Sequence, residues 1–529
     1  MTSDIRRMAS DGYVVETAYG PVRGAEDGIA AAGSGVRTKS WKGIRYGAPP
    51  VGELRFRAPQ PPQPWTEIAD ATAFGSVCPQ PVLANMPIDL GAPQDEDCLR
   101  LNIWAPANTA PGAAKPVMVW LHGGAYMLGS ASQALYDGRR LASSGEVIVV
   151  TVNYRLGALG FLDLSSLSHA GRSFDSNVGL RDVLAALHWV RENIAAFGGD
   201  PANITLFGES AGAGLVTTLL VTPAARGLFS RAIAQSSPAT SVYDRERAQR
   251  VAVHLLDKLG IAASDVDKLT QLPTAAIVAA STEVFNEVPV RNPGTLAFVP
   301  IVDGDVLTDY PVKVAQEGRS HPVPLLIGTN KHEAALFRLM RSPLMPITPR
   351  AITSMFTQIA AEQPDLQLPT EEEIGLAYSR LRRRARPLSI ATDVGFRMPS
   401  VWLAEGHSRV APVYLYRFDY STPLLKLLLV RAAHATELPY VWGNLGGPQD
   451  PTLRLGGAKT AKAVSKRMRT RWINFATQDN PAGPAGEPDW PAYQDGDRAC
   501  LVIDKSDRVA RDIDAPIRAA WGREVVGFR

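Results

Sequence analysis

The 529-residue sequence contains little cysteine, no long apolar run and almost no net charge. Its cysteines, Cys78, Cys98 and Cys500, are too few for a disulfide-dense scaffold, and their spacing fits no zinc motif. The longest apolar run, Leu424–Val430, is far shorter than the ~20 residues that cross a bilayer, so no transmembrane segment is predicted. The 55 Lys and Arg residues are nearly balanced by 52 Asp and Glu residues, so no nucleic acid partner is predicted either.

No secretory signal is readable at the start of the chain, because no apolar stretch follows Arg6 and Arg7 before Tyr13. We therefore expect a cytoplasmic protein, with secretion left open. The densest basic run, 380–386, follows Thr370–Glu373, a pattern typical of a capped helix start. We expect these arginines in the last turn of that helix, where they match the helix dipole rather than bind a polyanion.

The composition is that of a globular protein with a large core. Hydrophobic residues make up 45% of the chain, which includes 10 Trp, 15 Phe and 14 Tyr. No internal repeat or low-complexity linker divides the sequence into independent parts. We predict a short N-terminal tail, residues 1–12, and one large domain over residues 13–525 with helical insertions around 240–392.

Expected strands and helices alternate along the chain. Continuous apolar runs rich in β-branched residues are typical of strands that are covered on both faces, and they occur at Val117–Leu121, Val147–Val152, Ile204–Phe207, Val323–Ile327 and Val413–Phe418. Apolar residues at helical spacing predict helices at 180–197 and 211–221. These repeated units predict an α/β fold with a large, mostly parallel, doubly wound sheet.

The segment Gly208–Gly212 has the form G-x-S-x-G and lies between an expected strand and an expected helix. A serine at such a sharp turn projects its hydroxyl above the sheet, and the flanking glycines let a base and a substrate approach it. The helix that follows directs its N–H groups at the reacting carbonyl. The pattern therefore predicts Ser210 as a nucleophile.

A glycine-rich turn, His122–Tyr126, directly follows the expected strand that ends at Leu121. It is similar to the HGGG-type loops whose backbone N–H groups stabilise the oxyanion of a tetrahedral intermediate. We expect the N–H groups of Gly124, Ala125 and Ala211 to form this oxyanion hole.

The sequence resembles the type-B carboxylesterase family, which includes para-nitrobenzyl esterases and cholinesterases, from about Tyr13 to Tyr493. Besides the two glycine motifs, the likeness rests on the segments Gly43–Tyr46, Pro49–Phe56, Glu96–Trp104, Asn153–Gly157 and Phe197–Pro201. The resemblance implies an α/β-hydrolase fold and a serine carboxylic-ester hydrolase that acts on a small-molecule ester and requires no metal or organic cofactor. It does not indicate an oligomeric state.

The resemblance also implies which residues act with Ser210. The family's acid ends a G-x-x-x-x-E segment, which matches Gly328–Glu333, and its histidine matches His434. The glycine that commonly follows each of these residues is replaced by Ala334 and Ala435. Among the other histidines, His332 is the nearest rival as base, but it would have to fold back on its neighbour Glu333. His122, His188 and His254 are expected to have packing or hydrogen-bonding roles.

Further residues take supporting roles by resemblance. Glu209 matches a buried carboxylate beside the nucleophile, and Ser236 matches a serine that supports the acid and the base. The ion pairs Arg55–Glu96 and Arg155–Asp182 are expected to be structural. Cys78 and Cys98 match a disulfide found in extracellular family members, whose formation here would depend on the compartment.

Two alternatives to ester hydrolysis stay open from the sequence. One is a non-catalytic adhesion protein of the same fold, although such relatives typically lose catalytic residues and this chain keeps them all. The other is an amidase, thioesterase or acyltransferase that uses the same residues.

The substrate is expected to be uncharged. In cholinesterases the loop between the two matching cysteines supplies a tryptophan that binds the quaternary ammonium, and here 79–97 contains no aromatic residue. We expect choline esters to be poor substrates. We also expect Leu424–Val430 to line or overhang the pocket, with buried helix core as the alternative.

Overall fold

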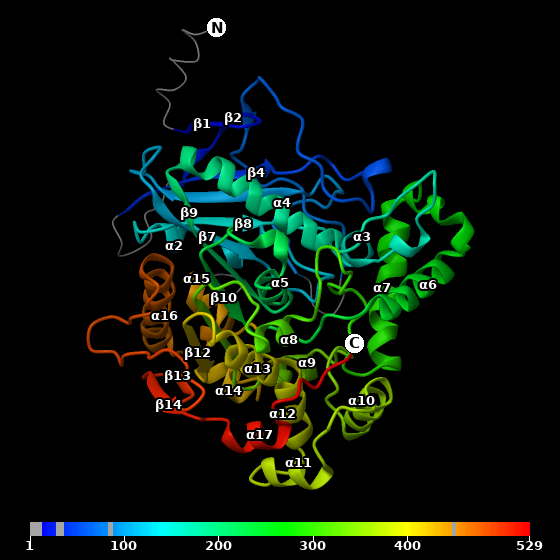
Figure 1. Cartoon of the computed structure of the whole chain (residues 1–529). Helices are drawn as coiled ribbons and strands as arrows, with labels where there is room; N and C mark the ends of the chain where they lie inside the picture. Colours follow the sequence, from blue (N-terminus) through cyan, green and yellow to red (C-terminus); the bar gives the residue numbers. More distant parts are fainter. Residues whose placement is uncertain (1–12, 28–35, 83–87, 447–450) are drawn as a thin grey trace.

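A sheet of eleven strands runs through the middle of the molecule in the computed structural model, which describes residues 13–27, 36–82, 88–446 and 451–529 (Figure 1). In their order across the sheet, its strands are β14 (Arg508–Arg511), β13 (Ala499–Ile503), β12 (Val413–Phe418), β11 (Leu325–Asn330), β10 (Arg231–Gln235), β9 (Gly199–Glu209), β7 (Lys115–Leu121), β8 (Ile148–Val152), β6 (Arg100–Pro106), β4 (Thr38–Arg45) and β3 (Ala25–Asp27). A smaller sheet joins β1 (Val14–Thr17), β2 (Gly20–Arg23) and β5 (Ala69–Asp70).

The centre of the large sheet, from β8 across to β13, is parallel throughout. Antiparallel pairs occur only towards its edges, between β3, β4, β6 and β8 on one side and between β13 and β14 on the other. The predicted mostly parallel sheet is therefore confirmed. All its central strands point their carboxyl ends to one edge, which is where such sheets place their active sites.

Helices connect the strands and cover both faces of the sheet (Figure 1). They are α2 (Arg139–Ala142), α3 (Gly157–Phe161), α4 (Val178–Asn193), α5 (Ala211–Leu219), α6 (Arg245–Leu259), α7 (Thr274–Arg291), α8 (Pro311–Gln316), α9 (Ala334–Leu339), α10 (Pro349–Glu362), α11 (Glu371–Ala377), α12 (Arg386–Thr392), α13 (Met398–His407), α14 (Pro423–Leu427), α15 (Leu438–Trp442), α16 (Ala458–Gln478) and α17 (Ala515–Trp521). The tail at 1–12 lies outside the described residues, and the division into a tail and one domain stays a prediction.

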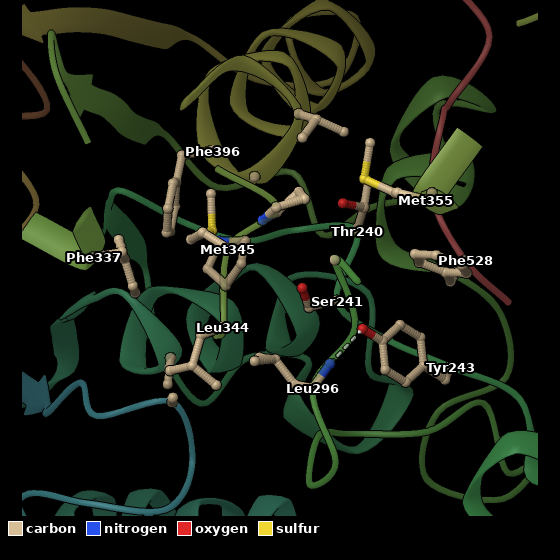
Figure 2. A pocket seen from close by; sticks show the side chains of 18 of the residues that line it. Thr240, Ser241, Tyr243, Leu296, Phe337, Leu344, Met345, Met355, Phe396 and Phe528 are labelled. Carbon is tan, nitrogen blue, oxygen red and sulfur yellow. Dashed lines mark hydrogen bonds between the residues drawn. The ribbon is translucent and has the colours of Figure 1, made fainter. Parts of the chain in front are cut away.

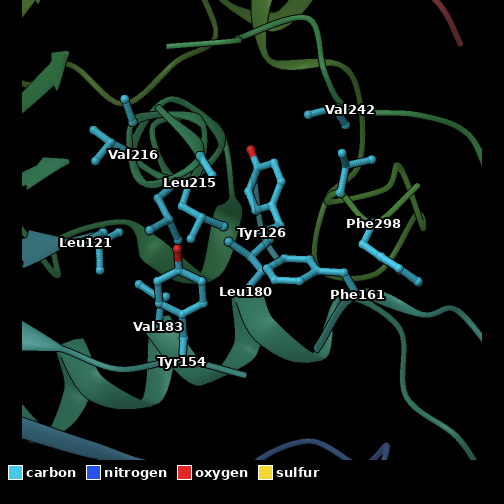
Figure 3. Close-up of a cluster of buried hydrophobic side chains, with 14 of the residues drawn as sticks. Leu121, Tyr126, Tyr154, Phe161, Leu180, Val183, Leu215, Val216, Val242 and Phe298 are labelled. Carbon is cyan, nitrogen blue, oxygen red and sulfur yellow. The ribbon is translucent and has the colours of Figure 1, made fainter. Parts of the chain in front are cut away.

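The core has two parts because successive side chains of each central strand point to opposite faces. On β7, Val119 and Leu121 belong to the cluster formed with α4 and α5, part of which Figure 3 shows. Met118 and Trp120 belong to the cluster on the other face, with α15 and α16. Since both faces are covered, the strand is buried along its apolar length, which explains its continuous apolar sequence.

The expected position of the basic run was wrong. The capping box at Thr370 is present, but α11 already ends at Ala377, so the arginines of 380–386 follow the helix instead of ending it. The cause lies at Tyr378, which leaves helical geometry and turns its side chain inward, where its hydroxyl donates a 2.6 Å hydrogen bond to Asp393. The next helix, α12, begins at Arg386 and has Pro387 in its first turn.

Both expected ion pairs are present and buried. Arg55 Nε donates to Glu96 at 2.9 Å, and Arg155 Nε donates to Asp182 at 2.8 Å. No helix in the described part of the chain combines the length and the apolar character that a bilayer crossing requires.

Candidate active site

Ser210 lies at the turn between β9 and α5 in a conformation that most residues avoid. Its backbone has φ 56° and ψ −123°, and its N–H donates a 2.9 Å hydrogen bond to the carbonyl of Gln235 on the neighbouring strand β10. A Cβ on Gly208 would lie 2.6 Å from the backbone of Gly212, and one on Gly212 would lie 2.1 Å from the carbonyl oxygen of Leu121. Glycine is thus required on both sides of Ser210 because the turn is packed backbone to backbone.

The loops after three parallel strands bring Ser210, His434 and Glu333 together. His434 Nε2 lies 2.7 Å from Ser210 Oγ, and His434 Nδ1 lies 2.8 Å from Glu333 Oε2. Ser210 follows β9, Glu333 follows β11, and His434 lies in the segment after β12. A hydroxyl, an imidazole and a carboxylate in this order can transfer a proton away from the hydroxyl and stabilise the resulting imidazolium.

The carboxylate of Glu333 is fully buried and accepts hydrogen bonds at both oxygens. Oε1 accepts from the Ser236 hydroxyl at 2.7 Å and from the backbone N–H of Asn330 at 2.6 Å, while Oε2 faces His434. These bonds satisfy the buried charge and fix the plane of the carboxylate. Ser236 therefore contacts the acid directly, and its supporting role stays a prediction.

A second carboxylate, Glu209, faces the same imidazole. Its Oε1 lies 3.2 Å from His434 Nε2, and burial raises the pKa of Glu209. Burial also acts to lower the pKa of His434, but the charges of Glu209 and Glu333 outweigh this and raise the pKa above the ordinary imidazole value. The imidazole is thus a stronger base than a free histidine.

The loop after β7 packs directly on Ser210. A Cβ on Gly123 would lie 2.6 Å from the Glu209 carboxylate and 3.0 Å from Ser210 Cβ, so only glycine fits there. The carbonyl of Gly124 accepts from the N–H groups of Met127 and Leu128, which closes the loop into a tight turn. Tyr126 is buried against Phe161, with ring centroids 5.0 Å apart, and anchors the loop in the core (Figure 3).

This turn leaves backbone donors next to the serine. Within the described residues, no backbone or side-chain acceptor takes the N–H of Gly124, Ala125 or Ala211. Ala125 and Ala211 line the same pocket as Ser210. These N–H groups are therefore available to a negatively charged oxygen bound beside Ser210.

Ser210 opens into a pocket, which Figure 2 shows from close by. Among the described residues that line it, none carries a charge, and most are apolar or aromatic. Phe337 and Phe396 contact the imidazole of His434, with ring centroids 5.3 and 4.6 Å apart. Such a pocket suits an uncharged organic substrate.

The expectation for Leu424–Val430 was wrong, because none of these residues lines the pocket. Leu427, Leu428 and Leu429 are instead 70%, 53% and 59% exposed. Leu425 and Val430 pack near Ala433, and the residues between them turn to the surface. The segment is neither pocket wall nor buried helix core.

Among the described residues, neither His332 nor His122 forms a hydrogen bond with Ser210, which contacts His434 instead. His332 is half-buried, its Nδ1 has no hydrogen-bond partner among the described residues, and burial lowers its pKa to about 4. The ring of His122 stacks on that of Tyr154, with centroids 4.5 Å apart, and its Nδ1 lies 2.9 Å from the carbonyl oxygen of Gly123.

The two cysteines that match a family disulfide, Cys78 and Cys98, are buried as free thiols in the structure. A hydrogen bond with Cys78, together with burial, raises the pKa of Cys98.

Sequence reasoning missed one buried carboxylate, Glu437. It accepts hydrogen bonds from the side-chain amides of Gln235, at 3.0 Å, and Asn330, and burial raises its pKa. Asn330 also donates to the carbonyl of Ala433, at 2.7 Å. Glu437 therefore connects β10 and β11 to the segment that carries His434. Its position three residues after His434 was the only available signal.

Comparisons with known proteins agree with this geometry. A profile described as the carboxylesterase family matches residues 11–521. The chain is 40% identical to the para-nitrobenzyl esterase of Bacillus subtilis over 96% of this chain and 97% of that protein, and 34% identical to carboxylesterase 1E of Mus musculus over 96% and 93%.

Solved structures show the same similarity. A para-nitrobenzyl esterase structure superimposes with a TM-score of 0.80 at 37% identity, covering 97% of this chain and 100% of that one. A carboxylesterase from Geobacillus stearothermophilus gives 0.81 at 37% identity, covering 96% and 100%. The predicted α/β-hydrolase fold is confirmed.

Proposed function

This chain belongs to the carboxylesterase family and is a serine ester hydrolase, and we propose that it cleaves uncharged carboxylic esters through an acyl-enzyme on Ser210. The observation that carries the proposal is the continuous contact from Ser210 Oγ through His434 to Glu333, at 2.7 and 2.8 Å. Because Ser210, His434 and Glu333 are all retained and in contact, the non-catalytic adhesion alternative is not retained.

In the first half of the reaction, His434 Nε2 takes the hydroxyl proton of Ser210 as Oγ attacks the ester carbonyl carbon. The carbonyl oxygen becomes an oxyanion. When the bond to the alkoxy group breaks, His434 returns the proton to that group, which leaves as an alcohol and leaves Ser210 acylated. Glu333 holds Nδ1–H throughout and stabilises the charged imidazole.

In the second half, water replaces the alcohol. A water molecule gives a proton to His434 as its oxygen attacks the acyl carbon. The bond between that carbon and Ser210 Oγ then breaks, Oγ recovers the proton from His434, and the carboxylic acid is released. The free serine is restored and no cofactor is consumed.

The oxyanion in both halves would accept hydrogen bonds from the N–H groups of Gly124, Ala125 and Ala211. Their support is positional: Ala125 and Ala211 line the pocket with Ser210, Gly124 directly precedes Ala125, and the three N–H groups have no acceptor among the described residues. Loss of one such donor typically lowers turnover by ~10²–10³. The preference for uncharged esters is supported by the absence of any charged side chain among the described residues of the pocket wall.

Replacement of the nucleophile tests this proposal. Ser210→Ala should abolish hydrolysis of a short aryl ester and covalent labelling by a fluorophosphonate probe, with an unchanged circular dichroism spectrum. Ser241→Ala is the matched control, because Ser241 lines the same pocket but has no contact with His434. Full labelling of Ser210→Ala at another serine would overturn the assignment.

A further inference from the structure

The exposed leucines of this protein occur together with positive charge. In the described part of the chain, all of them lie in four stretches that contain Lys or Arg but neither Asp nor Glu: 334–361, 374–392, 420–436 and 451–478. Over the whole sequence the two signs of charge are nearly balanced. Apolar exposure therefore coincides with local excess of positive charge.

Five of these leucines belong to segments that contact one another. Helices α9 and α14 both contribute to the apolar cluster around Ala433, and Arg338 on α9 donates to the carbonyl of Leu429 at 3.4 Å. A Cβ on Gly457 would lie 3.0 Å from Pro423 Cδ, so the loop before α16 touches the start of α14. The five leucines, which are 53–70% exposed, are called the leucine patch: Leu339, Leu427, Leu428, Leu429 and Leu455.

The turn that follows α14 carries three leucines of the patch and pairs its own backbone. The N–H groups of Val430 and Arg431 donate to the carbonyl of Leu425, at 3.0 and 2.9 Å. The N–H of Leu428 donates to the carbonyl of Leu424 at 2.9 Å. Because unpaired backbone groups are costly in an apolar environment, a turn with these bonds already made can enter the outer part of a lipid layer at low cost.

Basic side chains accompany the patch and form no ion pair with a described carboxylate. Asp419, which precedes α14, is already paired with Arg417 at 2.7 Å and with Lys331 at 3.0 Å. The patch therefore presents apolar side chains next to uncompensated positive charge. The five unpaired cations are exposed, and each lies within two residues of a leucine of the patch: Arg338, Arg341, Lys426, Arg431 and Arg454.

This combination favours an anionic lipid surface over a second copy of the chain. Leucines on a protruding turn can enter the boundary between headgroups and acyl chains, while neighbouring Lys and Arg bind anionic headgroups. A two-fold contact between two copies would bring the same basic side chains together, and their repulsion would oppose it.

We propose that the leucine patch docks this protein on the surface of a phospholipid bilayer that contains anionic lipids. Each leucine side chain that leaves water adds on the order of tenfold to the partition coefficient. Each basic side chain near the anionic surface adds about fivefold. Docking does not depend on the chemistry at Ser210, although α9 also carries Phe337, which lines the active-site pocket.

Flotation of the full chain with vesicles tests the proposal. The wild type should bind vesicles of phosphatidylcholine and phosphatidylglycerol, bind phosphatidylcholine alone far more weakly, and dissociate as the salt concentration rises. The double variant Leu427→Ser/Leu428→Ser should lower the partition coefficient on the order of 100-fold. Val253→Ser is the matched control, because Val253 is 56% exposed on α6, outside the patch, and it should bind like the wild type.

A charge reversal tests the electrostatic part separately. Lys426→Glu should lower the partition coefficient on anionic vesicles by about fivefold or more. Lys268→Glu changes the net charge equally but lies outside the patch, and it should have a smaller effect. An equal loss in both variants would show that net charge alone drives binding and would overturn the assignment to the patch.

The remaining outcomes separate docking from the proposed function. Ser210→Ala should bind vesicles like the wild type, and the leucine double variant should keep its hydrolysis of a soluble aryl ester and its circular dichroism spectrum. The proposal would be overturned if the wild type did not bind anionic vesicles, or if the double variant bound them equally well. A wild-type dimer in light scattering that the double variant dissociates would assign the patch to a second copy and overturn the proposal as well.

Discussion

Removal of the Ser236 hydroxyl tests how much the hydrogen bond from Ser236 to Glu333 contributes to catalysis. Glu333 Oε1 accepts two hydrogen bonds, from Ser236 at 2.7 Å and from the Asn330 N–H at 2.6 Å, and Ser236→Ala deletes the first. A hydrogen bond to a charged group contributes about 1.5–3 kcal/mol. If this support is expressed fully in the transition state, kcat should fall by about 10- to 100-fold.

The kcat/KM profile of Ser236→Ala should shift along the pH axis in one defined direction. Without the hydroxyl the buried carboxylate of Glu333 loses one of its hydrogen bonds, so the charged imidazole of His434 is stabilised less. The pKa of His434 then falls from its raised value, and the acid limb of the kcat/KM profile moves to lower pH while its plateau drops.

The assay is kcat/KM for a short aryl ester across pH, compared with Ser237→Ala. Ser237 is equally buried, but its hydroxyl contacts Thr217 at 3.0 Å and the Ala213 carbonyl at 3.2 Å rather than Glu333. Ser237→Ala should lower stability and keep the pH profile. An unchanged plateau and acid limb in Ser236→Ala, or the same shift in Ser237→Ala, would refute the reasoning. Ser236→Thr should restore most of the activity.

Three further predictions address the base, the second carboxylate and the substrate. His434→Ala should lower kcat on the order of 10⁴-fold or more, and His332→Ala should lower it by less than about tenfold. If steady-state kinetics gave the larger loss for His332→Ala, the base would be reassigned. Glu209→Gln removes a carboxyl group 3.2 Å from His434 Nε2 whose ionised form helps to raise the pKa of His434, so the acid limb of kcat/KM should move to lower pH, and a shift to higher pH would contradict this. Butyrylcholine should have a lower kcat/KM than a neutral aryl butyrate, because no charged side chain occurs among the described residues of the pocket wall; equal values would count against an uncharged substrate class.

Family resemblance identified the three triad residues one by one along the sequence. Their contact in space depends on the sheet. Ser210, Glu333 and His434 come together because each follows a strand of the parallel centre at the same edge. Their catalytic roles stay predictions until the variants are measured. The cysteine pair stays a prediction as well, since both thiols are free and buried in the structure.

The wrong expectations share one cause, which is that local sequence does not record what a segment packs against. Leu424–Val430 is apolar enough for a core helix, yet most of its leucines are exposed because, of this segment, Leu425 and Val430 are the residues that join a buried apolar cluster. The helix that begins at Thr370 stops at Ala377 because Tyr378 turns inward to reach Asp393. Neither contact can be inferred from periodicity.

The sequence by itself determined the features that depend on local backbone geometry. The glycines at Gly208 and Gly212 and the continuous apolar strands specify the turn at Ser210 and a sheet buried on both faces, because sterics and burial act on neighbouring residues. Only the tertiary structure decided the shape of the pocket. Glu437 and Phe528 acquire their positions from contacts with segments distant in sequence, and no local pattern encodes such contacts.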